Sequence, residues 1–163
     1  MYVSSIGLDA AENFWTLTLH PGHTDDGIWL NHWKDQTWHT VRLESCLPAD
    51  VVSVEGMMTF DTRDRLHIVL TTVSPSEIGD ASHWGHPSSE VFYLCSTDNA
   101  VTFDCLQLSL PDPSVANWLP SISRPGPYHP VESPTVLYTH GSVGTGLRPD
   151  THTEVRCLRL LNG

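Results

Sequence analysis

Short runs of hydrophobic residues recur along the whole chain and are separated by clusters of Gly, Pro, Asp and Asn. The runs are rich in Val, Ile, Thr and aromatic residues, which is typical of β-strands, and long helical periodicity is absent. The pattern predicts strands over residues 3–8, 14–20, 27–33, 38–44, 52–60, 66–73, 90–96, 103–110, 118–123, 135–140 and 154–160. The chain is therefore expected to be all-β.

The predicted strands fall into three consecutive sets. Residues 9–19 (DAAENFWTLTL) match residues 61–71 (DTRDRLHIVLT), since each segment is an Asp turn followed by an apolar strand. A weaker echo relates residues 90–95 (EVFYLC) to residues 154–159 (EVRCLR). The third set ends where a fourth strand is expected. The sequence thus predicts a single domain of two four-stranded meanders and an incomplete third, with approximate bounds 1–46, 47–111 and 112–163.

The segment STDNAVTF at residues 96–103 resembles the Asp-box, or BNR repeat, which reads Ser-x-Asp-x-Gly-x-Thr-aromatic. Four positions match the motif: Ser96, Asp98, Thr102 and Phe103. Ala100 stands where the motif has the glycine that accepts positive φ without strain. The Asp side chain is expected to hold the turn by accepting backbone N–H groups, while the aromatic ring packs between sheets. The motif therefore has a structural role.

A shortened counterpart, KDQTW at residues 34–38, stands at the equivalent place in the first set. Together with residues 117–122 (NWLPSI) and 133–141 (SPTVLYTHG), these motifs resemble the BNR-4 propellers, which include sialidase-like proteins and ulvan lyases. The resemblance implies a β-propeller of which this chain holds about three blades. Since propellers close with roughly four to eight blades, completion by a second copy, another chain or further blades of a longer chain is expected.

The same resemblance implies work on a carbohydrate, specifically an acidic polysaccharide. In a uronate lyase, Arg124 would neutralise the sugar carboxylate, with His129 as base and Tyr128 as acid. Further candidate substrate-binding residues are Trp84, Glu132 and His140. A sialidase-like glycoside hydrolase is an alternative, although no arginine cluster can be assigned. A non-catalytic propeller that serves as a scaffold for assembly is another alternative.

Candidate metal ligands are His83, His86 and Cys95, whose imidazole and thiolate groups suit zinc. A structural zinc or calcium ion is thus one possibility, and solvated histidines with Cys95 in the core are the other. The four cysteines, Cys46, Cys95, Cys105 and Cys157, include no CxxC pair and are expected to be buried, reduced thiols. Tryptophans in strands are expected in the core: Trp15, Trp29, Trp33, Trp38 and Trp118.

Charge narrows the range of partners. Nineteen acidic and eight basic residues give a formal net charge of -11, which disfavours nucleic acid and anionic membrane surfaces. No apolar run reaches the roughly 18 residues of a membrane span, and the first residues lack the pattern of a signal peptide. The sequence predicts a soluble chain, whereas the resemblance to polysaccharide-active proteins implies a secreted or periplasmic one.

Overall fold

A computed structural model describes residues 2–19, 27–77, 85–126, 130–142 and 152–160. Over these ranges the chain is all-β, as the sequence predicts, with eleven strands and two short 3₁₀ helices. The strands are β1 (Tyr2–Leu8), β2 (Phe14–Leu19), β3 (Ile28–Lys34), β4 (Thr37–Arg42), β5 (Val52–Phe60), β6 (Leu66–Val73), β7 (Glu90–Ser96), β8 (Asp104–Gln107), β9 (Ala116–Ile122), β10 (Thr135–Ser142) and β11 (His152–Arg159), and the 3₁₀ helices are η1 (Leu43–Cys46) and η2 (Pro75–Glu77). None of the helical segments so described is long and apolar enough to cross a bilayer.

The strands form three antiparallel sheets in which neighbours along the chain are neighbours in space. Sheet 1 has the order β1-β2-β3-β4, sheet 2 has the order β5-β6-β7-β8, and sheet 3 has the order β9-β10-β11. Each predicted strand is present, and the third set holds three strands within the described ranges. The described residues form no closed sheet.

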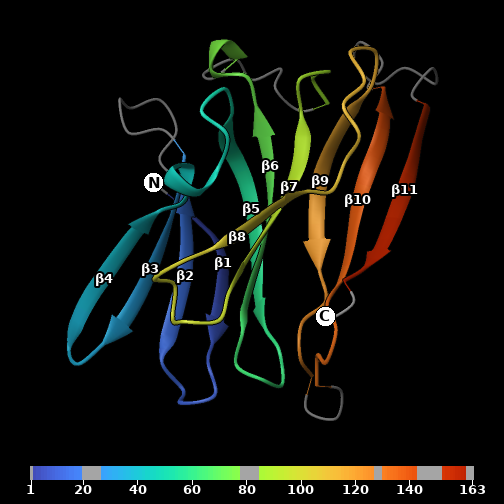
Figure 1. The fold of residues 1–163 in the computed structure, drawn as a ribbon. Helices are drawn as coiled ribbons and strands as arrows, with labels where there is room; N and C mark the ends of the chain where they lie inside the picture. Colours follow the sequence, from blue (N-terminus) through green and yellow to red (C-terminus); the bar gives the residue numbers. More distant parts are fainter. Residues whose placement is uncertain (1, 20–26, 78–84, 127–129, 143–151, 161–163) are drawn as a thin grey trace.

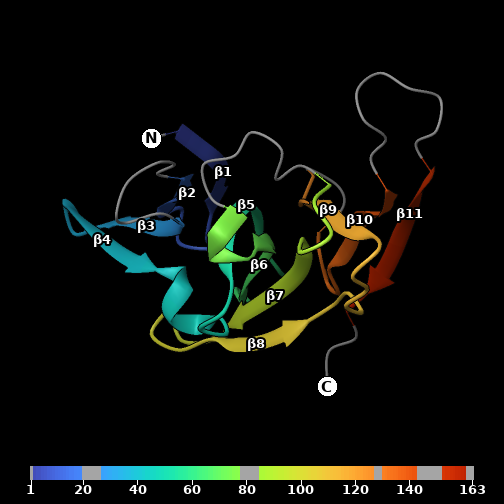
Figure 2. The ribbon, with the colours of Figure 1, turned by 90° about the horizontal axis from the view of Figure 1, so that it is seen from above.

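The three sheets form a fan. Figure 1 shows them side by side, and Figure 2, seen from above, shows β1, β5 and β9 close together, with β4, β8 and β11 at the periphery. Contacts between β1 and β5 and between β5 and β9 join the first strands of neighbouring sheets. Sheets 1 and 3 extend to opposite sides of sheet 2 (Figure 2).

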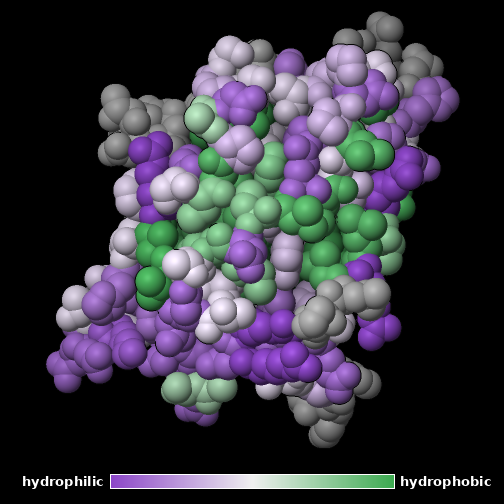
Figure 3. Space-filling model, in the orientation of Figure 1, coloured by the Kyte–Doolittle hydropathy of each residue, from purple (hydrophilic) through white to green (hydrophobic). Residues whose placement is uncertain are grey.

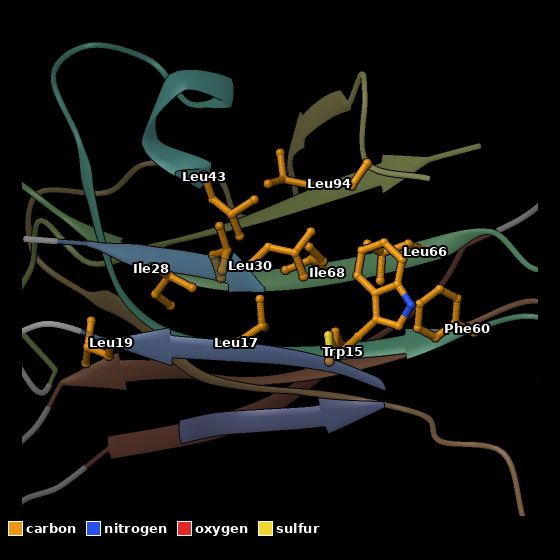
Figure 4. Close-up of a cluster of buried hydrophobic side chains, with 13 residues drawn as sticks. Trp15, Leu17, Leu19, Ile28, Leu30, Leu43, Phe60, Leu66, Ile68 and Leu94 are labelled. Atoms are coloured by element: carbon orange, nitrogen blue, oxygen red, sulfur yellow. The ribbon is translucent and has the colours of Figure 1, made fainter. Parts of the chain in front are cut away.

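Two apolar clusters fill the spaces between the sheets. Figure 4 shows the larger one, in which side chains of sheet 1 such as Trp15 and Leu30 meet side chains of sheet 2 such as Ile68 and Leu94. Gly56 permits this approach, because a Cβ there would lie 3.0 Å from Ile28 Cδ1 of sheet 1. The smaller cluster joins sheets 2 and 3 and consists of Val69, Val91, Ile122, Val136 and Tyr138. Burial of each large apolar side chain stabilises the fold by about 1.5–3 kcal/mol.

The connections between consecutive strands lie at two opposite ends of the fan. Because consecutive antiparallel strands reverse direction, residues 9–13, 35–36, 61–65, 97–103, 123–126 and 130–134 lie at one end, which we call the turn end. Residues 43–51, 74–77 and 108–115 lie at the other, which we call the loop end. The two ends have different chemistry.

At the turn end, Asp9 and Asp61 build the same turn in sheets 1 and 2. Asp9 Oδ1 accepts the backbone N–H groups of Ala11 (3.0 Å) and Asn13 (2.8 Å), and its Oδ2 accepts the indole Nε1–H of Trp15 (3.0 Å). Each turn thus ties a buried carboxylate to the ring of the following strand.

In the second turn, Asp61 Oδ1 accepts the backbone N–H groups of Arg63 and Arg65, each at 2.9 Å. Its Oδ2 lies 2.7 Å from Arg65 Nε and 3.1 Å from His67 Nε2, so His67 takes the place that Trp15 has in the first turn. Within the predicted match of residues 9–19 with residues 61–71, the two turns share this pattern of hydrogen bonds.

The hairpin turn at residues 96–103 is closed by its own side chains. Asp98 Oδ1 accepts the backbone N–H of Thr102 (2.9 Å), and Thr102 Oγ1 donates to Asp98 Oδ2 (2.6 Å). Ser96 Oγ accepts the N–H of Ala100 at 2.9 Å. The Ser96 hydroxyl also donates to Asp98 Oδ1 at 2.8 Å. The hydrogen bonds to the Asp98 carboxylate, that from the Thr102 hydroxyl above all, hold the pKa of Asp98 down to about 2. Phe103 packs against the core between sheets 1 and 2, as expected.

Ala100 has a φ of 64° and Asn99 a φ of 58°, the left-handed pair that a tight hairpin turn requires. Asp35 and Gln36 have φ values of 51° and 60° at the equivalent turn of sheet 1. The shortened counterpart therefore builds the same type of tight turn.

Two expectations about buried residues are wrong in part. Cys105 and Cys157 are exposed because they lie on the last strands of their sheets, whereas Cys46 and Cys95 are partly buried, and none of the four cysteines forms a disulfide. Trp15 and Trp118 are buried, but Trp33 and Trp38 are 40% and 49% exposed. These two rings belong to the face of sheet 1 that points away from sheet 2.

Candidate functional site

Of the residues proposed from the sequence for uronate chemistry, the structure describes Arg124, Glu132 and His140, and these three do not gather at one place. Arg124 follows β9 at the turn end and donates from Nη2 to Ser5 Oγ of β1 at 3.2 Å. Glu132 is exposed in the same connection. Tyr128, His129 and Trp84 lie outside the described residues. The structure therefore positions Arg124 as a link between sheets 3 and 1.

His140 lies at the opposite end of sheet 3. It pairs in register with Asn117 at the start of β9, whereas Arg124 follows the end of that strand. Since an extended strand rises about 3.3 Å per residue, the length of β9 separates the two side chains. Arg124 and His140 cannot act together on one sugar ring.

The candidate metal ligands are also separated. His86 precedes β7 and hydrogen-bonds through Nδ1 to Ser88 Oγ at 2.8 Å, while Cys95 stands near the far end of that strand. His83 lies outside the described residues. Nowhere in the described ranges do three His, Cys, Asp or Glu side chains form a group able to hold a metal ion. His86 and Cys95 therefore do not fit a shared zinc or calcium site.

A cleft of about 520 Å³ lies between the β8–β9 connection and sheet 3, at the loop end. It brings together an apolar wall and polar side chains from three strands. Its lining residues are Leu108, Leu110, Pro111, Asp112, Asn117, Tyr138, His140, Arg156, Cys157 and Leu158. We call it the loop-end cleft. It contains one residue of the predicted set, His140.

Apolar surface continues outside the cleft. Figure 3 shows an apolar area across the middle of the face that carries β8, with hydrophilic surface above and below it. Leu106 of β8 and Leu110 of the following connection are 56% and 86% exposed. The surroundings of the cleft can therefore contact the apolar faces of a ligand.

Behind the cleft, a buried polar network joins sheets 2 and 3. Asn117 Nδ2 donates to Glu90 Oε2 at 3.1 Å, and the hydroxyl of Ser109 donates to the same carboxylate oxygen. The amide oxygen of Asn117 lies 2.8 Å from His140 Nδ1. Glu90, Ser109 and Asn117 are each less than a tenth exposed, so the network is fixed by its surroundings.

This network determines the tautomer of His140. The Asn117 amide nitrogen is committed to Glu90, so its oxygen faces the ring, and an amide oxygen can only accept a hydrogen bond. His140 Nδ1 therefore carries the proton, and in the neutral ring Nε2 is the basic nitrogen. The His140 imidazole is thus oriented as a proton acceptor.

Tyr138 and Arg156 extend the polar part of the cleft. They pair in register on β10 and β11, and Arg156 forms an ion pair with Glu154. At the rim, Asp112 Oδ1 accepts the hydroxyl of Ser114 at 2.6 Å and its backbone N–H at 2.8 Å. The cleft thus offers a guanidinium, a phenol, an imidazole and a carboxylate.

Burial shifts the acid–base properties of Glu90 in the buried network and of Tyr138 in the cleft. Desolvation raises the pKa of Glu90 above its ordinary value, against the hydrogen bonds from Ser109 and Asn117 that lower it. Burial likewise raises the pKa of Tyr138, while the charge of Arg156 acts to lower it. Both shifts favour the protonated forms, so Tyr138 remains a proton donor at neutral pH.

Comparison with known proteins does not identify the cleft. No family model, curated protein or solved structure matches the chain. The resemblance to Asp-box propellers therefore depends on the motifs of the sequence, and the function must be argued from the cleft.

Sequence reasoning missed Glu90, Asn117, Tyr138 and Arg156. Two signals were available: Asn117 is a polar residue inside an apolar strand, and Tyr138 and His140 are two positions apart, which places them on one face of β10. Their convergence with Glu90 depends on the packing of sheet 3 against sheet 2, which local pattern does not encode.

Proposed function

We propose that the three sheets are consecutive blades of a sialidase-like β-propeller and that the loop-end cleft binds an acidic saccharide. The blade assignment is supported by the fan arrangement, by the repeated meander and by the Asp turns and hairpins at one end. A propeller blade is a four-stranded antiparallel sheet, and sheets 1 and 2 have that order.

The observation that carries the binding proposal is the grouping of Arg156, His140 and Tyr138 beside an apolar wall. A guanidinium matches a sugar carboxylate, because it can form two parallel charge-assisted hydrogen bonds. Imidazole and phenol groups suit sugar hydroxyls, and leucine side chains suit the apolar faces of the ring. Ligand sites commonly combine an apolar lining with a few oriented polar groups.

The same groups would support lyase chemistry on a uronate. Arg156 would bind the carboxylate, and His140 Nε2 would take the proton from the neighbouring carbon. The bond to the glycosidic oxygen would then break, and Tyr138 would give its proton to that leaving oxygen. The products are a shortened saccharide and an unsaturated uronate, and no oxidant or reductant is consumed.

Calorimetric titration with oligouronates of defined length tests the binding proposal. We expect binding of the acidic oligosaccharide and none of a neutral one of equal length. Arg156→Ala should weaken binding at least tenfold, since a hydrogen bond to a charged group is worth about 1.5–3 kcal/mol. Arg159→Ala is the matched control, because Arg159 is exposed on β11 outside the cleft lining. Equal affinities of the two variants would contradict the proposal.

A second measurement separates the classes of function. A rise in absorbance at the unsaturated-uronate band would identify a lyase, and release of reducing sugar without that band would identify a hydrolase. Binding with neither signal would identify a binding module. The alternative of an assembly scaffold is favoured by the exposed apolar face of sheet 1 and predicts no saccharide binding at all.

A further inference from the structure

The face of sheet 1 that points away from sheet 2 is apolar and exposed. Along β1, Val3, Ile6 and Leu8 are each more than half exposed, and Phe14 and Trp38 border them. Phe14 and Trp38 meet edge to face at 6.2 Å between ring centroids. We call this surface the leading face. Soluble proteins seldom leave a contiguous apolar sheet face in contact with water, so a partner is expected there.

The internal repeat shows what kind of surface covers such a face. A shift of 52 residues takes Asp9 to Asp61, and it also takes the four β1–β2 pairs from Ser5↔Leu17 to Leu8↔Phe14 onto pairs of the β5–β6 register. Ile6 then corresponds to Met58, and Leu8 corresponds to Phe60. Met58 and Phe60 are buried in the cluster that sheet 2 forms with sheet 1. The leading face therefore occupies the position that, in sheet 2, is covered by the preceding sheet.

Sheet 3 carries the complementary open surface. Its side chains Val136 and Tyr138 face sheet 2, and the alternate residues point the other way. Leu137 is 41% exposed and Val155, on the neighbouring strand, is 69% exposed. We call this surface the trailing face. It is the side that sheets 1 and 2 each present to the sheet that follows them.

The polar residues in the middle of the leading face do not oppose burial. They line a groove of about 450 Å³ and are hydrogen-bonded to one another. Asn31 Nδ2 donates to Thr18 Oγ1 at 3.0 Å, and Thr40 Oγ1 donates to Asn31 Oδ1 at 3.2 Å. Because these groups are already paired, a partner can cover them without leaving a buried polar group unsatisfied.

We propose that the leading face of one chain packs against the trailing face of a second copy. The contact continues the interface that the chain already uses twice, between sheets 1 and 2 and between sheets 2 and 3. Since sheets 1 and 3 extend to opposite sides of sheet 2, two copies joined by two such contacts form a closed ring of six sheets (Figure 2). The inference rests on the blade assignment and is independent of saccharide binding.

Sedimentation velocity on the full chain over a dilution series tests this directly. We expect a species of twice the mass of one chain, which dissociates on dilution. Ile6→Glu on the leading face and Val155→Glu on the trailing face should each give monomers. Both side chains are more than half exposed in the single chain, so circular dichroism should show unchanged folding. Val101→Glu is the control, because Val101 is 79% exposed in the β7–β8 turn, outside both faces.

A mixture of the two variants tests the head-to-tail geometry. Ile6→Glu retains its trailing face and Val155→Glu retains its leading face, so the mixture has one intact contact and should form a heterodimer. A pairing of two leading faces predicts instead that Val155→Glu remains dimeric and that the mixture gains nothing, which would overturn the proposal.

A wild-type chain that stays monomeric at every concentration would also overturn it. If such a monomer bound a neutral oligosaccharide and lost that binding in Trp38→Ala, the leading face would be a sugar-stacking surface. The ring proposal and the saccharide proposal can be tested separately. Because the loop-end cleft lies within one chain, the monomeric Ile6→Glu variant should still bind an oligouronate.

Discussion

Glu90 and His140 show how single residues acquire their properties from the fold. In the sequence, Glu90 is the first residue of an apolar strand, and nothing nearby distinguishes it from a solvated glutamate. In the structure it is 8% exposed and accepts hydrogen bonds from Ser109 and Asn117. The buried carboxylate orients Asn117, and Asn117 in turn fixes the His140 tautomer.

The raised pKa of Glu90 predicts a specific pH dependence of stability. Its ordinary value is 4.5, and the folded chain holds the proton more tightly. Its contribution to stability is therefore complete below about pH 4.5 and is lost as the pH rises through the folded-state pKa. Glu90→Gln removes this titration, so its unfolding midpoint should gain on that of the wild type as the pH rises above 4.5.

Thermal unfolding at several pH values between 4 and 8, followed by circular dichroism, provides the measurement. Glu12→Gln is the control, because Glu12 is exposed at the turn end, and it should follow the wild type. A wild type that becomes more stable than Glu90→Gln with rising pH would show that the Glu90 carboxylate is better paired than the network described above.

Among the elements, the two Asp turns have the most similar construction. Each carboxylate accepts two backbone N–H groups and then a ring nitrogen of the following strand, Trp15 in one turn and His67 in the other. The turns also contact each other, since Ala10 N–H donates to Asp64 Oδ1 at 2.7 Å. A backbone hydrogen bond from Thr62 to Val131 at 2.9 Å joins the second turn to sheet 3.

Asp9→Ala and Asp61→Ala should therefore both destabilise the chain, by unequal amounts. Loss of Asp9 removes hydrogen bonds from neutral donors, at a cost of about 2 kcal/mol. Loss of Asp61 also leaves the partly buried Arg65 and the buried His67 without their carboxylate, at a cost of about 3–4 kcal/mol.

Urea unfolding at pH 7 gives both values, with the exposed Asp50→Ala as control. Although burial acts to raise it, hydrogen bonds from Arg65 and His67 lower the pKa of Asp61. Its contribution to stability is therefore present above its ordinary value of 3.8 and is lost as the pH falls through the folded-state pKa. Equal stability of the two variants would contradict the assigned roles of Arg65 and His67.

The sequence predicts the strands and turns better than it predicts the cleft. Strand alternation and the turn residues at positions 9–13, 35–36 and 98–100 are local, so they located every strand of the described chain. The predicted burial of Trp33 and Trp38 is wrong, because a tryptophan in a strand indicates an apolar face but does not indicate whether another sheet covers that face. The loop-end cleft needed the β8–β9 connection and all three strands of sheet 3, which no local pattern relates.

At the scale of the whole molecule, the fan has two open faces of similar character. The space between sheets 1 and 2 is filled by large apolar side chains, as is the space between sheets 2 and 3. The leading face of sheet 1 and the trailing face of sheet 3 present comparable residues to water. Stability should therefore depend on whether these two faces are covered.

A two-copy ring predicts that the thermal unfolding midpoint rises with protein concentration, because association stabilises the folded chain by mass action. The midpoint of Ile6→Glu should be independent of concentration. Differential scanning calorimetry over a hundredfold concentration range measures both. A midpoint that is constant for the wild type as well would show that the folded chain gains nothing from association.

The separation of the two ends has a consequence for how such a chain can change. The carboxylate turns that join β1 to β2 and β5 to β6 lie at the turn end, while the cleft lies at the loop end. Insertions and substitutions between β8 and β9 can therefore alter what is recognised without disturbing the carboxylate turns. The turns that stabilise the strands and the loop that lines the cleft are therefore separate parts of the fold. A laboratory selection for new ligands should yield variants with changes in residues 108–115.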